Sequence, residues 1–175
     1  MNRAQLEHLI RAAATIADDD EIVVVGSQSV LGQHPNAPAA LLVSMEADVY
    51  PRNHPERWDL IDGSIGEGSP FHSTFGYYAQ GVGPETAILP AGWESRAIRI
   101  NTPGTRGATG IALEIHDLLV AKYAAGREKD RAFGRTAFQS GLAVPEQVLD
   151  RAAAAPLDEE HRKRIGAMIR ADARR

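Results

Sequence analysis

The spacing of apolar residues along the chain predicts an N-terminal helix, a region of short strands and a final group of helices. Apolar side chains recur every three or four positions over residues 2–17, and Asn2 has a side chain suited to cap a helix. The acidic run Asp18–Asp20 leads into residues 21–25, whose continuous apolar run is typical of a strand buried on both faces. A second strand is expected over residues 41–50.

Glycine and proline mark the turns in the middle of the chain. Residues 26–29 (GSQS) predict a turn that opens a short helix, and residues 32–40 predict a loop. The other elements expected here are a short helix near residues 56–61 and short strands at 75–80, 86–89, 96–100 and 111–113. The turns between these strands indicate an antiparallel meander.

A helical pattern continues from residue 115 to the end of the chain. The expected helices cover residues 115–125, 130–140, 145–155 and 157–175, and Gly126 and Gly141 end the first two. This order of elements predicts an α/β (α+β) fold, in which helices flank a short mixed sheet and form the C-terminal third. We expect a single domain in which residues 1–113 form the sheet core and residues 114–175 pack on it.

Composition narrows the class of protein. The 175 residues suit one domain, and a hydrophobic content of 43% is enough to build a core. The absence of cysteine excludes disulfides, thiolate metal sites and cysteine nucleophiles. No apolar run approaches the roughly 20 residues of a membrane span, and the N-terminal pattern is not that of a signal peptide. We therefore expect a cytoplasmic protein with no membrane partner.

The distribution of charge is only a weak indication of what the protein binds. A net charge of −4 provides no general attraction to nucleic acid, although residues 161–175 are strongly basic. We interpret this basic stretch as a solvated helix face, and a contact with nucleic acid or phosphate is the alternative.

Two acidic residues on the second expected strand are the first candidates for chemistry. Period-two alternation places Ser44, Glu46 and Asp48 on one face of that strand. Neighbouring carboxylates repel each other, and a divalent cation would relieve the repulsion. Mg²⁺ is typically held by one or two carboxylates together with substrate phosphates. An edge strand that carries incidental acids toward solvent explains the same spacing equally well.

The turn after the first strand could hold a phosphate. A glycine such as Gly26 lets main chain and ligand approach closely, and Ser27 and Ser29 lie where free N–H groups at a helix start favour an anion. An ordinary polar strand exit has the same sequence, because turns of this kind are common.

Basic residues follow in the helical region. Lys122 interrupts an otherwise apolar helix, and Arg127 and Lys129 come just after its end. Together they could neutralise a triphosphate, although a lone lysine in an apolar helix often reaches out to water instead. Asp130 could orient one of these cations, or it could cap the next helix.

Taken in order, Gly26-Ser27, the Ser44-x-Glu46-x-Asp48 strand and the segment Asp117–Asp130 resemble the minimal nucleotidyltransferases of the polymerase-β superfamily. The most similar branch is that of the AbiEii-like toxins and related bacterial nucleotidyltransferase-like proteins. The resemblance spans roughly residues 20–140. It implies a nucleotidyltransferase fold, an NTP substrate and Mg²⁺.

The resemblance also implies roles for individual residues. Glu46 and Asp48 would bind Mg²⁺, and Lys122 would contact the triphosphate and stabilise developing negative charge. Asp130 completes the expected catalytic set. The nucleotide-binding residues would be Gly26, Ser27, Ser29, Ser44, Arg127 and Lys129.

The implied activity is transfer of a nucleoside monophosphate from an NTP to an RNA end, such as that of a tRNA, or to a protein hydroxyl. The protein would then be the toxin of a toxin–antitoxin or phage-defence pair, with a cognate antitoxin as partner.

The chain departs from the family pattern at Glu46, where aspartate is usual. Candidates for a third carboxylate are Glu85, Glu94 and Glu114, and the pattern selects none of them. The alternatives are a nucleotide-binding or partner-binding module of the same fold with little or no catalysis, and a purely structural protein. The sequence indicates neither the acceptor, the preferred nucleotide nor the oligomeric state.

Overall fold

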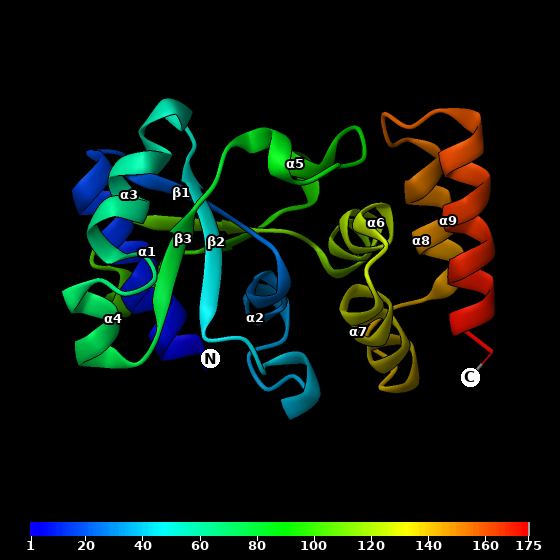
Figure 1. The fold of residues 1–175 in the computed structure, drawn as a ribbon, viewed down its shortest axis with the longest axis horizontal. Helices are drawn as coiled ribbons and strands as arrows, with labels where there is room; N and C mark the ends of the chain where they lie inside the picture. Colours follow the sequence, from blue (N-terminus) through cyan, green and yellow to red (C-terminus); the bar gives the residue numbers. More distant parts are fainter. Residues whose placement is uncertain (175) are drawn as a thin grey trace.

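A five-stranded mixed sheet lies at the centre of the N-terminal part of the chain (Figure 1). A computed structural model describes residues 1–174 and shows the strands in the order β3-β2-β1-β5-β4. Their bounds are β1 Glu21–Val25, β2 Glu46–Pro51, β3 Tyr78–Gly81, β4 Ile98–Ile100 and β5 Thr109–Ala112. The expected α/β architecture with a helical C-terminal part is confirmed.

Helices cover both faces of this sheet. Those of the N-terminal part are α1 (Arg3–Ala17), α2 (Val30–Gln33), α3 (Trp58–Ile65), α4 (Pro70–Phe75) and α5 (Trp93–Arg96). Figure 1 shows α1, α3 and α4 on one side of the sheet and α2 on the other. The apolar residues of β1 are buried between these layers, as the sequence predicted.

Local signals set the first helix as expected. The Asn2 side chain accepts a hydrogen bond from the Gln5 amide, while the Gln5 side chain accepts one from the Asn2 amide. Asp18 ends the helix in a left-handed conformation. Buried Asp19 then accepts hydrogen bonds from the amides of Glu21, Asn53 and His54, and so ties the end of α1 to the start of β1 and the end of β2.

The second expected strand begins later than the sequence pattern indicated. Residues Ala39–Leu41 form a 3₁₀ turn, and β2 starts only at Glu46. Ser44 lies before the strand and bonds locally, since its hydroxyl accepts from the Glu46 amide at 3.1 Å. The shared face therefore holds for Glu46 and Asp48, and it was wrong for Ser44.

The antiparallel meander was also wrong, because β3 and β4 lie at opposite edges of the sheet and do not pair with each other. β2 and β3 are parallel, because the connection between them contains α3 and α4 and is long enough for a crossover. The strand expected at residues 75–80 is shortened by α4, which Ser69 caps and Pro70 begins. No strand forms at residues 86–89, which follow a 3₁₀ turn at Pro84–Thr86.

The C-terminal helices agree closely with the expected pattern. They are α6 (Ile115–Ala125), α7 (Glu128–Gln139), α8 (Pro145–Ala153) and α9 (Glu159–Asp172). Gly126 ends α6 at a φ of 67°, a conformation that favours glycine. In Figure 1, α6 and α7 lie between the sheet and the α8–α9 pair. Among residues 1–174, no helix combines the length and the apolar character that crossing a membrane requires.

Candidate functional site

The acidic strand meets the glycine turn at the pairing of β1 and β2. Val25 lies opposite Asp48 in this antiparallel pair, so the turn that begins at Gly26 lies beside the carboxylate. A Cβ atom placed on Gly26 would come within 1.9 Å of Asp48 Oδ2, and Gly26 has a φ of 67°. The position therefore requires glycine twice over, once for its conformation and once for the close approach of Asp48.

Glu46 lies two residues earlier on the same face of β2. Its carboxylate accepts a hydrogen bond from the Tyr78 hydroxyl, with 2.9 Å between Oη and Oε2. Burial, followed by the hydrogen bond to Glu46, raises the pKa of Tyr78 to about 12, so this phenol keeps its proton at neutral pH. Tyr78 was missed in the sequence because only the parallel pairing of β2 with β3 places it opposite Glu46.

The electrostatics of Asp48 are unusual for a carboxylate. Burial is the largest cause that raises its pKa, and the charge of Glu46 adds to it, so the pKa reaches about 6. The charges of Lys122, Lys129 and Arg127 act in the opposite direction without cancelling the shift. The two acids thus form a site in which negative charge is only partly compensated.

Lys122 is held inside the helical region by an ion pair. It is 7% exposed, and its Nζ lies 3.0 Å from Asp130 Oδ1 and 4.9 Å from the centre of the Phe133 ring. Burial lowers the pKa of Lys122, and the charge of Asp130 opposes that shift. The lysine side chain therefore does not simply extend to water.

Asp130 organises the two nearest cations. Its other oxygen accepts from Arg127 Nε at 2.6 Å. Burial acts to raise the pKa of Asp130, but the hydrogen bond from Arg127 and the charge of Lys122 outweigh burial and lower it. The capping alternative is wrong, because Arg127 is the N-cap residue of α7 and Asp130 lies within the helix. Lys129 is exposed beside them.

The serines of the first turn differ in their surroundings. Ser27 is half-buried directly after Gly26. Ser29 is fully buried, and its hydroxyl donates to the Val24 carbonyl at 3.0 Å and accepts from the Leu113 amide. Those bonds join the ends of β1 and β5, so the role of the Ser29 hydroxyl is to hold these strands together and not to bind a nucleotide.

None of the candidates for a third carboxylate joins the acidic pair. Glu85 is exposed in the turn at Pro84–Thr86, and Glu94 forms an ion pair with Arg52 at 2.8 Å. Glu114 caps α6 and bonds to His116. Within residues 1–174, no group of three or more histidine, aspartate or glutamate side chains is arranged to hold a metal ion.

The residues present nevertheless fit Mg²⁺ in combination with a nucleotide. Two carboxylates supply the hard oxygen ligands that Mg²⁺ prefers, and substrate phosphates commonly complete its coordination. The main chain at Gly26 approaches Oδ2 of Asp48 closely. Glu46 and Asp48 are the residues that would bind the ion.

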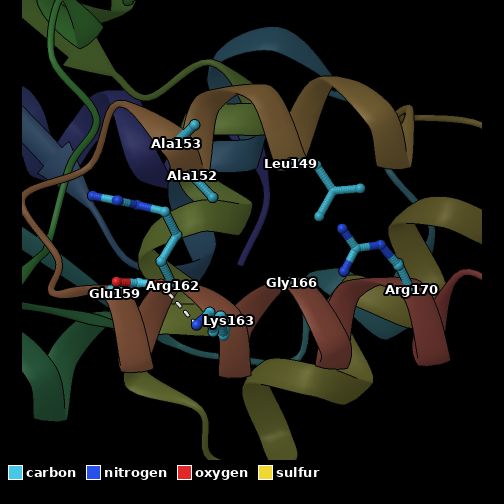
Figure 2. Close-up of a pocket in the computed structure, with 8 residues that line it drawn as sticks. All are labelled: Leu149, Ala152, Ala153, Glu159, Arg162, Lys163, Gly166 and Arg170. Carbon is cyan, nitrogen blue, oxygen red and sulfur yellow. Dashed lines mark ion pairs between the residues drawn. The ribbon is translucent and has the colours of Figure 1, made fainter.

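A groove lies between α8 and α9 (Figure 2), away from the strand that carries these acids (Figure 1). It has a volume of about 410 Å³, and small or apolar residues such as Leu149, Ala152 and Gly166 line it. Arg162 and Arg170 extend over this lining in Figure 2, and Lys163 pairs with Glu159 at 2.7 Å. The groove contains no acidic pair, so it is not the candidate reaction site.

The β2 acids lie beside the Gly26 turn, and the charges of the cations on α6 and α7 act on Asp48. In a comparison with protein families, the family described as "Nucleotidyltransferase of unknown function (DUF6036)" matches residues 4–135. The chain belongs to this family. The matched residues include every member of the candidate site. Searches of curated proteins and of solved structures gave no match.

Proposed function

We propose that the protein is a Mg²⁺-dependent nucleotidyltransferase, which transfers a nucleoside monophosphate from an NTP to an RNA end or to a protein hydroxyl. One observation carries the proposal. Glu46 and Asp48 share a face of β2 beside the Gly26 turn, and the charges of Lys122, Arg127 and Lys129 act on Asp48. Membership of a nucleotidyltransferase family supports the reaction class.

The acidic pair would bind the metal ion. Burial raises the pKa of Asp48, and repulsion by Glu46 adds to the shift; a divalent cation held by the two carboxylates would offset that repulsion. When bound, Mg²⁺ neutralises phosphate charge and helps to orient the phosphates for in-line displacement. Unpaired acids on a half-buried strand are costly without such a ligand.

The cations would bind the triphosphate. Arg127 and Lys129 are exposed and can reach an anion, whereas buried Lys122 supplies charge near the acids. Asp130 holds Lys122 and Arg127 in fixed positions, which limits the entropy lost when the nucleotide binds. Gly26 and Ser27 would let the phosphates approach the main chain.

The transfer needs no reactant other than the NTP and the acceptor. The acceptor hydroxyl oxygen forms a bond to the α-phosphorus while the bond from that phosphorus to the leaving oxygen breaks. Pyrophosphate leaves, and the acceptor proton passes to solvent. Positive charge from Lys122 stabilises the negative charge that develops on the phosphates.

Incorporation of labelled nucleotide tests the proposal. Each of four α-labelled NTPs is incubated with the protein, Mg²⁺ and either total RNA or a protein extract. We expect label in one acceptor pool with the wild type and with Asp59→Asn, which alters an exposed acid on α3. Asp48→Asn should lose the label. Absence of label in both pools for all four NTPs would contradict the proposal.

A second candidate is a nucleotide-binding module with little or no catalysis. Two observations favour it: the acidic pair has no third carboxylate partner among the described residues, and Lys122 is already paired with Asp130. Calorimetry with NTP and Mg²⁺ separates the candidates. Binding without transfer favours the module, and absence of both NTP and Mg²⁺ binding contradicts both.

The toxin role rests on the family resemblance alone. It predicts that expression of the wild type slows bacterial growth, that Asp48→Asn relieves the effect, and that a cognate antitoxin restores growth. Normal growth at high expression of the active wild type would argue against it.

A further inference from the structure

Within residues 1–174, the side chain that hydrogen-bonds to a carboxylate of the acidic pair is that of Tyr78. We propose that Tyr78 is a positioning residue, which holds Oε2 of Glu46 and leaves Oε1 to bind a divalent cation together with Asp48. The inference rests on the proposed function, because it concerns the metal site of that reaction. It assigns a role to a strand that the sequence pattern alone did not connect with the acids.

Main-chain bonds on both sides fix Tyr78 opposite Glu46. The two residues face each other in the parallel β2–β3 register. The Tyr78 amide donates to the Met45 carbonyl at 3.0 Å, and at the other end the Val82 amide donates to the Val49 carbonyl at 3.0 Å. A slip of one residue would turn the tyrosine to the other face of the sheet, so the register and the side-chain bond depend on each other.

A histidine supports the tyrosine ring from the adjacent helix. The rings of His72 and Tyr78 lie 4.5 Å apart between centroids, tilted by 46°. His72 is itself anchored, since its Nδ1 accepts from the Gly68 amide at 3.0 Å and its own amide donates to Ser69 Oγ at 3.1 Å. The start of α4 thus restricts Tyr78, and Tyr78 in turn restricts Glu46.

This arrangement explains why glutamate can occupy the position where the family resemblance leads us to expect aspartate. The additional methylene of Glu46 lets its carboxylate reach the Tyr78 hydroxyl, but it also adds a rotatable bond whose freedom must be lost when a cation binds. The tyrosine removes part of that freedom before the cation arrives. Second-sphere hydrogen bonds to carboxylate ligands commonly change metal affinity by about 10- to 100-fold.

The test compares two adjacent tyrosines. Tyr78→Phe removes the hydroxyl at Glu46, and the matched control Tyr77→Phe removes a hydroxyl that bonds His8 Nδ1 at 2.7 Å instead. The probe is Mn²⁺ alone, titrated into the full chain by calorimetry. We expect Tyr78→Phe to weaken Mn²⁺ binding by about tenfold and Tyr77→Phe to leave it unchanged.

A double-mutant cycle shows whether the effect passes through Glu46. Glu46→Asp shortens the side chain away from the hydroxyl, so adding Tyr78→Phe should change Mn²⁺ affinity by less than about twofold. Wild-type affinity in Tyr78→Phe, or an equal loss in the Glu46→Asp background, would overturn the inference. If Tyr78→Phe fails to fold, His72→Ala replaces it and should weaken binding by about two- to threefold, with unchanged affinity overturning the inference.

The same titrations distinguish two kinds of failure. If the wild type and Tyr77→Phe bind Mn²⁺, Asp48→Asn does not, and Tyr78→Phe behaves as the wild type, only the role of Tyr78 is lost. If the wild type binds Mn²⁺ at millimolar concentration neither alone nor with an NTP present, the metal site itself is absent, and the proposed function fails with it.

Discussion

In the part of the chain that the structure describes, the buried carboxylates of the helical region form ion pairs, whereas the carboxylates of strand β2 do not. In the helical region, the three fully buried aspartates each pair with basic side chains: Asp117 with Arg96, Asp130 with Lys122 and Arg127, and Asp172 with Arg131 and Arg135. On β2, neither Glu46 nor Asp48 takes part in any ion pair formed by residues 1–174.

The difference separates buried acids that have basic partners from a pair of acids that has none among the described residues. A paired buried carboxylate has its desolvation offset by hydrogen bonds and charge, as the lowered pKa of Asp130 and of Asp172 indicates. Asp48 has no such partner, and its pKa is raised to about 6. Perturbed carboxylates in a half-open position are typical of functional sites.

The largest expected effect comes from breaking a paired acid. Asp172→Ala leaves Arg131 and Arg135 without their shared partner and should lower the free energy of unfolding by about 2–4 kcal/mol, measured by urea denaturation. The matched control Asp150→Ala removes an exposed acid on α8 and should change it by less than about 0.5 kcal/mol. Equal effects in the two variants would remove the contrast between the regions.

Gly26→Ala should have the next largest effect. Its Cβ would collide with Asp48 Oδ2, and its φ of 67° is unfavourable for alanine, so we expect a loss of about 2–3 kcal/mol and weaker Mn²⁺ binding. Gly68→Ala is the control, because it carries a positive φ of 75° with open space around its Cβ. A similar loss of Mn²⁺ affinity in both variants would show that the Asp48 contact is not needed.

Asp48→Asn should stabilise the metal-free protein and abolish its binding of a metal ion. The pKa of Asp48 is raised in the folded state, so the folded protein binds this proton more tightly than the unfolded chain does. The stability that the bound proton contributes is lost as the pH rises from about 4 to about 6. The variant removes that loss, so at pH 8 we expect a gain of about 1–2 kcal/mol, together with loss of Mn²⁺ binding. A variant that is less stable than the wild type at pH 8, with the same pH dependence, would contradict the assigned electrostatics.

The smallest effect is expected at Ser44. Its hydroxyl bonds to the Glu46 main chain, so Ser44→Ala should cost about 0.5–1 kcal/mol and leave NTP and Mn²⁺ binding unchanged. A clear loss of NTP affinity without a change in stability would restore the nucleotide-binding role that the family resemblance implied.

Some elements could be predicted because their signals are local. Asn2 and Gln5 form the capping box that starts α1, and Gly126 ends α6 at the expected residue. The start of β2 and the absence of a strand at residues 86–89 could not be predicted, since short apolar stretches become strands only where a neighbouring strand supplies hydrogen bonds.

The sequence by itself determined that Glu46 and Asp48 share a face, because successive side chains alternate along any strand. It also indicated Lys122, Arg127 and Asp130 as neighbours along α6 and α7. Only the tertiary structure decided that Gly26 contacts Asp48, that Tyr78 faces Glu46, and that Ser29 belongs to the framework. These contacts depend on the strand order and register, which follow from the packing of segments far apart in the chain and not from local periodicity.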